Sequence, residues 1–332
     1  METAPHRYYI GIDTSNYTTS CALFDARDRR FLSNVKRLLK VAEGGRGLRQ
    51  SDAVFAHVKN LPEVVTEALR ELDPSELRAV GVSVSPRDAD GSYMPCFLSG
   101  EAAASALSAG AKKPLCRFSH QAGHIMAAVW SSGAMELLRD DFIAFHVSGG
   151  TTELLLVSPR QGGDGLKLDV KKLGGTLDLN AGQAIDRSGV RMGLDFPCGP
   201  ALEKLALEGI SAGKRFERSG VSVKGCCCNL SGLENKVVGM LEKGADKSVC
   251  AGYIFDFIGR TLTSLTENAI SENGRLPLLY AGGVMSNSII KDMISRRFPD
   301  AKFAEPMFSS DNAAGTALLA AASTEGTDFW KE

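Results

Sequence analysis

Two strand–turn–strand units constrain the fold of this 332-residue chain more than any other feature. The central one has an apolar strand (Ile143–Val147), the turn Ser148-Gly149-Gly150 and a second apolar run (Leu154–Val157). A similar unit, with a polar turn, spans Tyr8–Phe24. One Gly-Gly turn indicates only a hairpin. Two such units, each opening one half of the chain, predict a duplicated architecture with a ligand between the halves.

Helical and strand patterns alternate along the rest of the chain and predict an α/β fold. Apolar residues at helical spacing predict helices over Ser51–Leu72, Ser119–Trp130 and Ser248–Glu272, and Leu77–Ser85 is typical of a buried strand. A last helix is predicted over Ser309–Ala322. The glycines of the central turn admit positive φ and allow close approach of backbone N–H groups to a ligand. Such a group of amides suits an anion.

Length, net charge and cysteine content limit the classes of protein to which this chain can belong. The length favours two domains, and a net charge of −1 argues against a protein that binds nucleic acid unaided, although another subunit could supply positive surface. Met1–Arg7 lacks a signal-peptide pattern and no apolar run reaches membrane-spanning length, so we expect a cytoplasmic protein. The 8 cysteines form no CxxC pair. Cys226–Cys228 could bind a metal or act in redox chemistry, but packing of small residues beside a turn is favoured.

His120 and His124 are the first candidate metal ligands. At i, i+4 on a helix both imidazoles project from one face and can share a metal, although structural histidines often have this spacing too. Position 121 is Gln, so the general base of an HExxH metalloprotease is absent. The pattern therefore argues against a peptidase and leaves the metal and structural interpretations open.

Asp311 allows two interpretations. It lies in Ser309-Ser310-Asp311-Asn312, ahead of the Ala-rich last helix, where its carboxylate would serve as an N-cap. Alternatively, it supplies a third, oxygen ligand to a His/His/Asp site. The cap is favoured unless the fold brings the two regions together.

Three further stretches could bind a nucleotide. Asp186 lies on a predicted helical face with small residues and could bind ribose hydroxyls, while Gly199 follows in a tight turn. Ala281-Gly282-Gly283-Val284 ends a strand and leads to Asn287, and α/β proteins bind nucleotides at such turns. Neither GxxxxGK[ST] nor GxGxxG is present, so surface solvation remains an alternative for Asp186.

Together these stretches resemble the TsaD/glycoprotease family, which shares the duplicated ribonuclease-H-like fold of actin, sugar kinases and chaperone ATPases. The similarity spans almost the whole chain. The matching stretches are Gly11–Ser15, Ser119–His124, Val147–Gly150, Asn180–Pro200, Leu230–Leu233, Ala281–Asn287 and Ser310–Ala314. The resemblance implies two domains, 1–112 and 113–332, with the site in the cleft between them and the last helix packing back on the first.

The resemblance also implies a chemistry. It assigns one divalent metal, iron or zinc, to His120, His124 and Asp311, with no catalytic residue beyond the metal site. It assigns nucleotide contacts to Val147, Ser148, Gly149, Gly150, Asp186, Gly199 and Asn287. The expected reaction moves a threonylcarbamoyl group from its adenylate to N6 of the adenosine beside a tRNA anticodon. The tRNA is expected only with partner subunits, in a homo- or heterodimer of the family type.

Departures from the family pattern concentrate in the first domain. Asp13-Thr14-Ser15-Asn16 replaces the usual Glu-Thr-Ser-Cys, and Pro86–Gly91 replaces a Gly-Pro-Gly-Leu turn. Thr151 replaces a histidine and Asn180 an acidic residue. These changes indicate a divergent paralogue. They leave two alternatives open: carbamoyl or acyl transfer to another acceptor, and a non-catalytic nucleotide-binding partner of a true family member.

Overall fold

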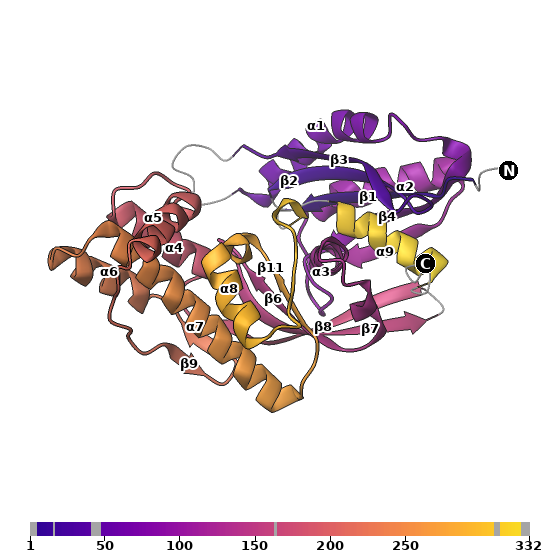
Figure 1. The fold of residues 1–332 in the computed structure, drawn as a ribbon. Helices are drawn as coiled ribbons and strands as arrows, with labels where there is room; N and C mark the ends of the chain where they lie inside the picture. The colour runs from indigo at the N-terminus through magenta and orange to yellow at the C-terminus, as the bar shows by residue number, and fades with distance from the viewer. Residues whose placement is uncertain (1–4, 16, 41–47, 163–164, 309–312, 327–332) are drawn as a thin grey trace. The chain divides into compact units, whose positions relative to one another are not determined.

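The computed structural model describes residues 5–15, 17–40, 48–162, 165–308 and 313–326 (Figure 1). Two compact units divide the chain. Unit 1 comprises Met1–Asp140, Ser158–Val170 and Met307–Glu332, and unit 2 comprises Asp141–Val157 and Lys171–Pro306. The predicted boundary after residue 112 concerns the two duplicated domains and stays a prediction.

Unit 1 is built on a five-stranded sheet of order β3-β2-β1-β4-β5. Its strands are β1 (Tyr8–Ser15), β2 (Thr18–Asp25), β3 (Arg30–Leu38), β4 (Leu77–Ser85) and β5 (Leu115–Ser119). The first three are antiparallel, whereas β4 runs parallel to β1 and to β5. Its helices are α1 (Gln50–Ala68), α2 (Phe97–Ala111), α3 (His120–Ser131) and α9 (Ala314–Glu325), with 3₁₀ turns η1 (Pro74–Glu76), η2 (Met135–Arg139) and η4 (Pro306–Phe308).

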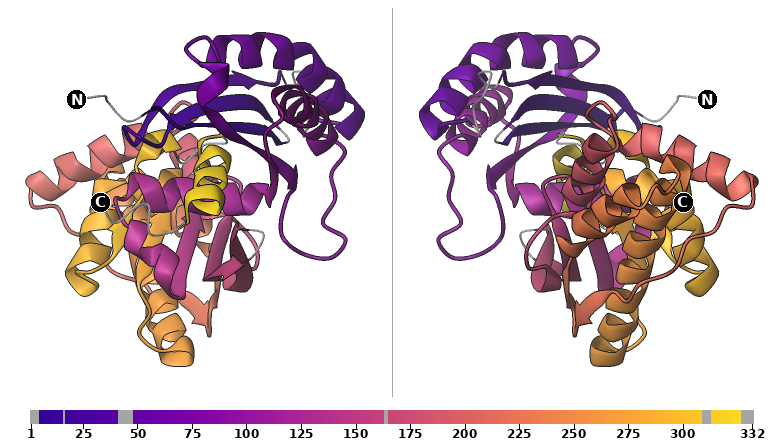
Figure 2. Two further views of the ribbon diagram at one scale, coloured as in Figure 1. Left: turned by 90° about the vertical axis from the view of Figure 1, so that its right-hand side faces the viewer. Right: turned by 90° about the vertical axis from the view of Figure 1, so that its left-hand side faces the viewer.

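Helices cover both faces of this sheet (Figure 2). Ile10, Ile12 and Val80 point to α1 and α2 and join their apolar residues in one core. On the other face α9 lies directly on the strands, because Gly11 and Gly81 have no side chain. A Cβ on Gly81 would lie 2.5 Å from the carbonyl oxygen of Thr316. Two glycines thus set where the first turn of α9 packs.

Unit 2 holds a seven-stranded sheet of order β12-β11-β6-β7-β8-β10-β9, although parts of β7 and β8 fall in the segment Ser158–Val170 of unit 1. Its strands are β6 (Phe142–Val147), β7 (Thr152–Gly162), β8 (Gly165–Thr176), β9 (Ser222–Lys224), β10 (Cys227–Asn229), β11 (Leu278–Ala281) and β12 (Lys302–Phe303). Its helices are α4 (Ala181–Arg191), α5 (Gly199–Ser211), α6 (Gly232–Glu242), α7 (Lys247–Asn273) and α8 (Ser288–Arg297), with the 3₁₀ turn η3 (Gly283–Ser286).

Buried side chains of α7 form the centre of the unit 2 core. Phe255, Ile258 and Leu262 are among them, and they share one apolar cluster with Phe145 of β6 and Tyr280 of β11. The rings of Phe145 and Tyr280 stack with centroids 4.7 Å apart. The parallel strands β6 and β11 are therefore fixed side by side, so the turns that follow them start from one edge of the sheet.

Most elements predicted from the sequence are confirmed, with two qualifications. The last helix starts at Ala314, five residues after the predicted Ser309. The run Cys226–Cys228 enters the short strand β10, and Cys226 and Cys228 are buried free thiols, which confirms packing as their explanation. Among the described residues, no helix combines the length and the apolarity that a membrane crossing would need.

Candidate functional site

The central turn joins β6 to β7 in unit 2. The Ser148 N–H donates to the Thr151 carbonyl at 2.7 Å, and the Ser148 hydroxyl oxygen accepts from the N–H groups of Gly150 and Thr151 at 3.3 and 3.1 Å. Neither Gly149 nor Gly150 adopts positive φ. These glycines are therefore not required for a left-handed backbone. A Cβ on either would meet nothing within 4 Å, so the backbone at both positions has open space beside it.

The N-terminus of α4 packs against this turn. The Gly182 N–H donates to the Ser148 carbonyl at 3.1 Å, and the Ala181 N–H donates to the Thr152 hydroxyl at 2.9 Å. Asn180 and Gln183 form a capping box at the helix start. A Cβ on Gly182 would lie 2.7 Å from the Cα and N of Gly149. Glycine at 182 is thus what lets the helix and the turn touch.

A pocket of about 290 Å³ opens beside this contact, entirely within unit 2. Its lining includes four residues predicted to bind nucleotide: Gly149, Asp186, Gly199 and Asn287. The structure thus gathers them in one place, and Val147, Ser148 and Gly150 belong to the same turn as Gly149. The remaining lining residues are Gly182, Ile185, Pro197, Pro200, Glu203, Phe255, Gly283, Val284 and Ser286.

Local hydrogen bonds fix the polar residues of this pocket. Asp186 Oδ1 accepts the Cys198 N–H at 2.8 Å, so the carboxylate holds the start of α5. Burial, reinforced by the charge of Asp186, raises the pKa of the Cys198 thiol and keeps it protonated. Asn287 is buried and caps α8, with its side-chain oxygen accepting the Ile290 N–H at 3.0 Å.

Glu203 is a pocket residue that the sequence prediction missed. It stands four positions after Gly199 on α5, which places both on one helix face. Its Oε1 accepts from the backbone N–H and the hydroxyl of Ser288, at 2.7 and 2.5 Å, and so links α5 to the start of α8. The i, i+4 spacing from a predicted nucleotide residue was the available signal.

The predicted histidine pair lies at the start of α3 in unit 1. Ser119 caps this helix by accepting the Ala122 N–H. His120 Nε2 and His124 Nε2 face each other at 2.9 Å. His120 Nδ1 lies 2.9 Å from Oδ1 of the buried Asp13. The two Nε2 atoms therefore point to one place, while the other nitrogen of His120 is occupied by a carboxylate.

Asp13 was missed as a contact of the histidines because 107 positions separate it from His120. Asp311, the predicted third ligand, lies outside the described residues. The start of α9, which follows it, packs directly against α3. A Cβ on Gly315 would overlap the carbonyl of Gly123, which lies between the two histidines in the sequence.

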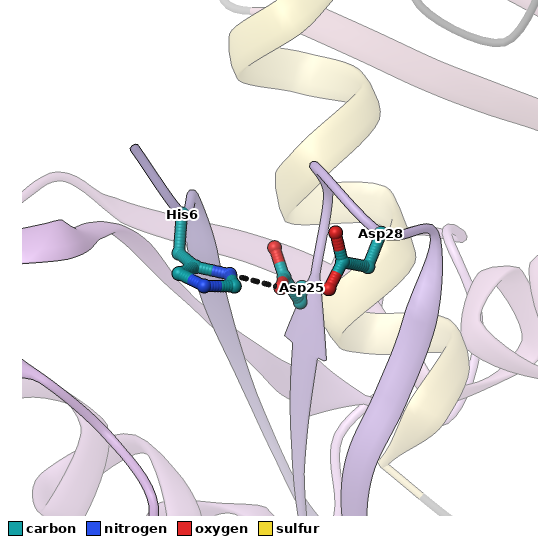
Figure 3. A group of neighbouring side chains, drawn as sticks. All are labelled: His6, Asp25 and Asp28. Carbon is teal, nitrogen blue, oxygen red and sulfur yellow. Dashed lines mark hydrogen bonds and ion pairs between the residues drawn. The ribbon is translucent and has the colours of Figure 1, made fainter. Parts of the chain in front are cut away.

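A second group of possible ligands lies at the opposite end of β1 and β2 (Figure 3). Ligand atoms of His6, Asp25 and Asp28 lie within 4.8 Å of one another. However, His6 Nδ1 already contacts Asp25 Oδ2 at 2.5 Å, and Asp28 accepts from the Arg27 guanidinium at 2.8 Å. The group is therefore explained as an ion-pair network.

Comparison with known proteins identifies the family. The model of the TsaD family, described as tRNA N6-adenosine threonylcarbamoyltransferase, matches residues 33–318. The chain belongs to this family. A relative of that name from Thermus thermophilus is 31% identical over 94% of this chain and 92% of its own length. The predicted enzyme class, a tRNA N6-adenosine threonylcarbamoyltransferase-type transferase, is thereby confirmed.

Three further similarities concern one curated relative and two solved structures. A probable bifunctional tRNA threonylcarbamoyladenosine biosynthesis protein of Thermoplasma volcanium is 28% identical over 86% of this chain, which spans only 50% of that relative. The crystal structure of HypF from T. kodakarensis matches 99% of this chain and 49% of its own, with a TM-score of 0.56 at 15% identity. Component A of the (R)-2-hydroxyglutaryl-CoA dehydratase of Acidaminococcus fermentans matches with a TM-score of 0.51 at 15% identity, over 95% of this chain and 97% of its own. The structural matches bear on the fold alone, and the predicted duplicated ribonuclease-H-like α/β fold is confirmed.

Proposed function

We propose that this chain transfers the threonylcarbamoyl group of threonylcarbamoyl-adenylate to N6 of the adenosine beside a tRNA anticodon, and that the transfer depends on one divalent metal, iron or zinc. The observation that carries the proposal is the pair of imidazole nitrogens, His120 Nε2 and His124 Nε2, that face each other at 2.9 Å. Family membership supports it, as does the pocket of unit 2, which is lined by four of the residues predicted to bind nucleotide.

The donor set fits a metal. Zn–N bonds are about 2.0–2.1 Å, so two nitrogens on one ion lie roughly 2.8–3.0 Å apart at octahedral angles and roughly 3.3–3.4 Å apart at tetrahedral angles, which is close to the observed separation. Asp13 on His120 Nδ1 supplies the carboxylate that commonly orients a ligating histidine and sets its tautomer. When bound, such an ion supplies Lewis-acid polarisation of a carbonyl.

Asp311 is proposed as the third ligand. It precedes Ala313 by two residues, and consecutive Cα atoms are about 3.8 Å apart. Support comes from the contact of Gly315 with Gly123, because that contact ties the start of α9 to the turn of α3 between His120 and His124.

The adenylate is proposed to bind in the pocket of unit 2. The backbone of Ser148, Gly149 and Gly150 would face the phosphate, and Asp186 the ribose hydroxyls. Asn287 and Glu203 supply amide and carboxylate groups that could contact the base. In the transfer, the acceptor N–C bond forms and the C–O bond of the mixed anhydride breaks. AMP leaves with that oxygen, and the amine loses one proton.

The test is a transfer assay with preformed adenylate labelled in its threonine, tRNA, and the family's partner subunits. Wild type should label the tRNA. His120→Ala should lose the label while still binding ATP, and Asp186→Ala should keep its metal while binding ATP more weakly. Unlabelled tRNA with the wild type, under conditions where both metal and ATP are bound, would refute the proposal.

A second candidate function is transfer of a carbamoyl or acyl group to another acceptor. The altered turn at Pro86–Gly91 favours it, because Asp88 of this turn accepts a hydrogen bond from Ser119, the cap of the helix that carries the histidines. Labelling of small amines, with tRNA left unlabelled, would select this candidate. Nucleotide binding without turnover on any acceptor would instead indicate a non-catalytic partner of a true family member.

A further inference from the structure

The turn after β4 is fastened to the helix that carries the histidine pair. The Pro86 carbonyl accepts the Gln121 N–H at 3.1 Å, and Asp88 Oδ2 accepts the Ser119 hydroxyl at 2.9 Å. Ser119 is the cap of α3 and immediately precedes His120. Both anchors therefore lie within one residue of His120, so this turn is held beside the start of the helix that carries the two imidazoles.

The turn is also closed on itself. The Ser85 hydroxyl donates to the Arg87 carbonyl at 3.1 Å, the Arg87 N–H donates to the Ser92 hydroxyl at 3.0 Å, and the Ser92 N–H donates to the Ala89 carbonyl at 3.0 Å. These bonds give the turn a defined shape without a buried core. We call residues 85–93 the acceptor turn from here on.

Helix capping alone would explain the Asp88–Ser119 bond. A second feature is the exposure of Tyr93, a residue that is 63% exposed at the end of a hydrogen-bonded turn. Exposed aromatic rings are the platforms on which proteins stack unpaired bases, at about 1–3 kcal/mol per base. The charges of the acceptor turn favour one kind of ligand. Two carboxylates, Asp88 and Asp90, accompany one guanidinium, Arg87, so an amine-bearing base edge suits the turn better than a phosphate.

We propose that the acceptor turn binds the base that receives the transferred group, with Tyr93 stacking on that base and Asp88 accepting a hydrogen bond from its exocyclic amine. The ligand class is an unpaired aminopurine in RNA. This inference rests on the proposed function, because it names the contacts that present the amine beside the histidine pair.

The test compares two RNA hairpins that differ at the acceptor position. One carries adenosine and serves as substrate. The other carries inosine, whose O6 replaces the amine, and serves as a competitive inhibitor. Wild-type enzyme, with its partner subunits, should hold the inosine hairpin at least about fivefold more weakly than the adenosine hairpin, because a carboxylate cannot donate to O6. Asp88→Asn should remove that difference, since the amide both keeps the Ser119 bond and donates to O6.

Tyr93→Ala and Tyr93→Phe form a matched pair. The alanine variant should raise KM for the adenosine hairpin about tenfold and weaken inosine-hairpin inhibition equally, as expected for lost stacking. The phenylalanine variant should behave as wild type. Metal content and ATP affinity should stay unchanged in all three variants, which a purely structural role of the turn would not predict.

The possible outcomes distinguish failure of the proposed function from failure of the inference about the acceptor turn. If wild type labels the adenosine hairpin but both Asp88→Asn and Tyr93→Ala keep its KM and its discrimination against inosine, the inference fails and the proposed function stands. If wild type labels no RNA, both fail together. An Asp88→Asn enzyme that prefers the adenosine hairpin as strongly as wild type does would by itself overturn the role of the carboxylate.

Discussion

Gly182→Ala tests whether the contact between α4 and the Ser148–Gly150 turn shapes the nucleotide site. The new Cβ would lie 2.7 Å from Gly149 Cα and N, whereas ordinary contacts begin near 3.4 Å, so the turn must move by about 0.7 Å. Overpacking of this kind costs about 1–3 kcal/mol. The better helix propensity of alanine offsets up to about 1 kcal/mol. We expect the free energy of unfolding to fall by about 0–3 kcal/mol.

Nucleotide affinity should fall as well, because the displaced turn carries the amides predicted to face the phosphate. Loss of one hydrogen bond to a charged phosphate costs about 1.5–3 kcal/mol, and 1.4 kcal/mol is a factor of ten. Gly182→Ala should therefore bind ATP about 10–100-fold more weakly in calorimetric titration. Gly239→Ala in α6 is the control, because its Cβ would meet nothing within 4 Å. A folded Gly182→Ala protein that binds ATP within twofold of wild type would refute this reasoning.

Three further predictions concern packing and ionisable side chains. Gly315→Ala should lower the melting temperature, because its Cβ would overlap the Gly123 carbonyl. Gly110→Ala is the control and should raise the melting temperature, because its Cβ would meet nothing within 4 Å. Equal melting temperatures for the two variants would count against the packing argument. Asp178 is an exposed residue whose carboxylate loses some water contact, yet hydrogen bonds from Ser231 and nearby backbone N–H groups outweigh that loss and hold its pKa well below its usual range. Asp178→Asn should therefore lose about 1 kcal/mol at neutral pH, and in urea titrations this loss should shrink below pH of about 3.9, where the unfolded chain takes up its proton. Burial lowers the pKa of His57, so the unfolded chain takes up a proton at this residue before the folded protein does. Wild-type stability should therefore fall as the pH drops below about 6.5, and His57→Gln should make that fall less steep. Parallel pH profiles of stability for the two proteins would contradict this prediction.

Sequence patterns predicted those elements whose bounds are set locally. The strand Leu77–Ser85 is recovered residue for residue as β4, because a short apolar run between a Pro-containing turn and a polar turn has few alternatives. The helix at Ser119 is recovered because its cap residue is adjacent in sequence. The start of α9 was placed five residues early, because its position depends on contacts with Gly11 and Gly81 that no local pattern contains.

The same distinction holds for the candidate site. His120 and His124 follow from helical spacing, and Asp186 and Gly199 follow from short motifs, so both pairs were predicted. The contact of Asp13 with His120 joins positions 107 residues apart, and only the fold brings them together. Glu203 had a local signal, one helical turn after Gly199, that the motif-based prediction did not use. Contacts between residues far apart in the sequence, such as that of Asp13 with His120, are thus the part of the site that sequence spacing cannot predict.

The metal content of the purified protein tests the central claim most directly. Wild type and the variants His120→Ala, His124→Ala and Asp311→Ala would be measured by mass spectrometry beside His6→Ala, which removes the second group of possible ligands. We predict close to one iron or zinc per chain in wild type and in His6→Ala, and loss of that ion in the other three variants. An ion retained in all three, or lost only with His6→Ala, would contradict the proposal of a metal centre at His120 and His124.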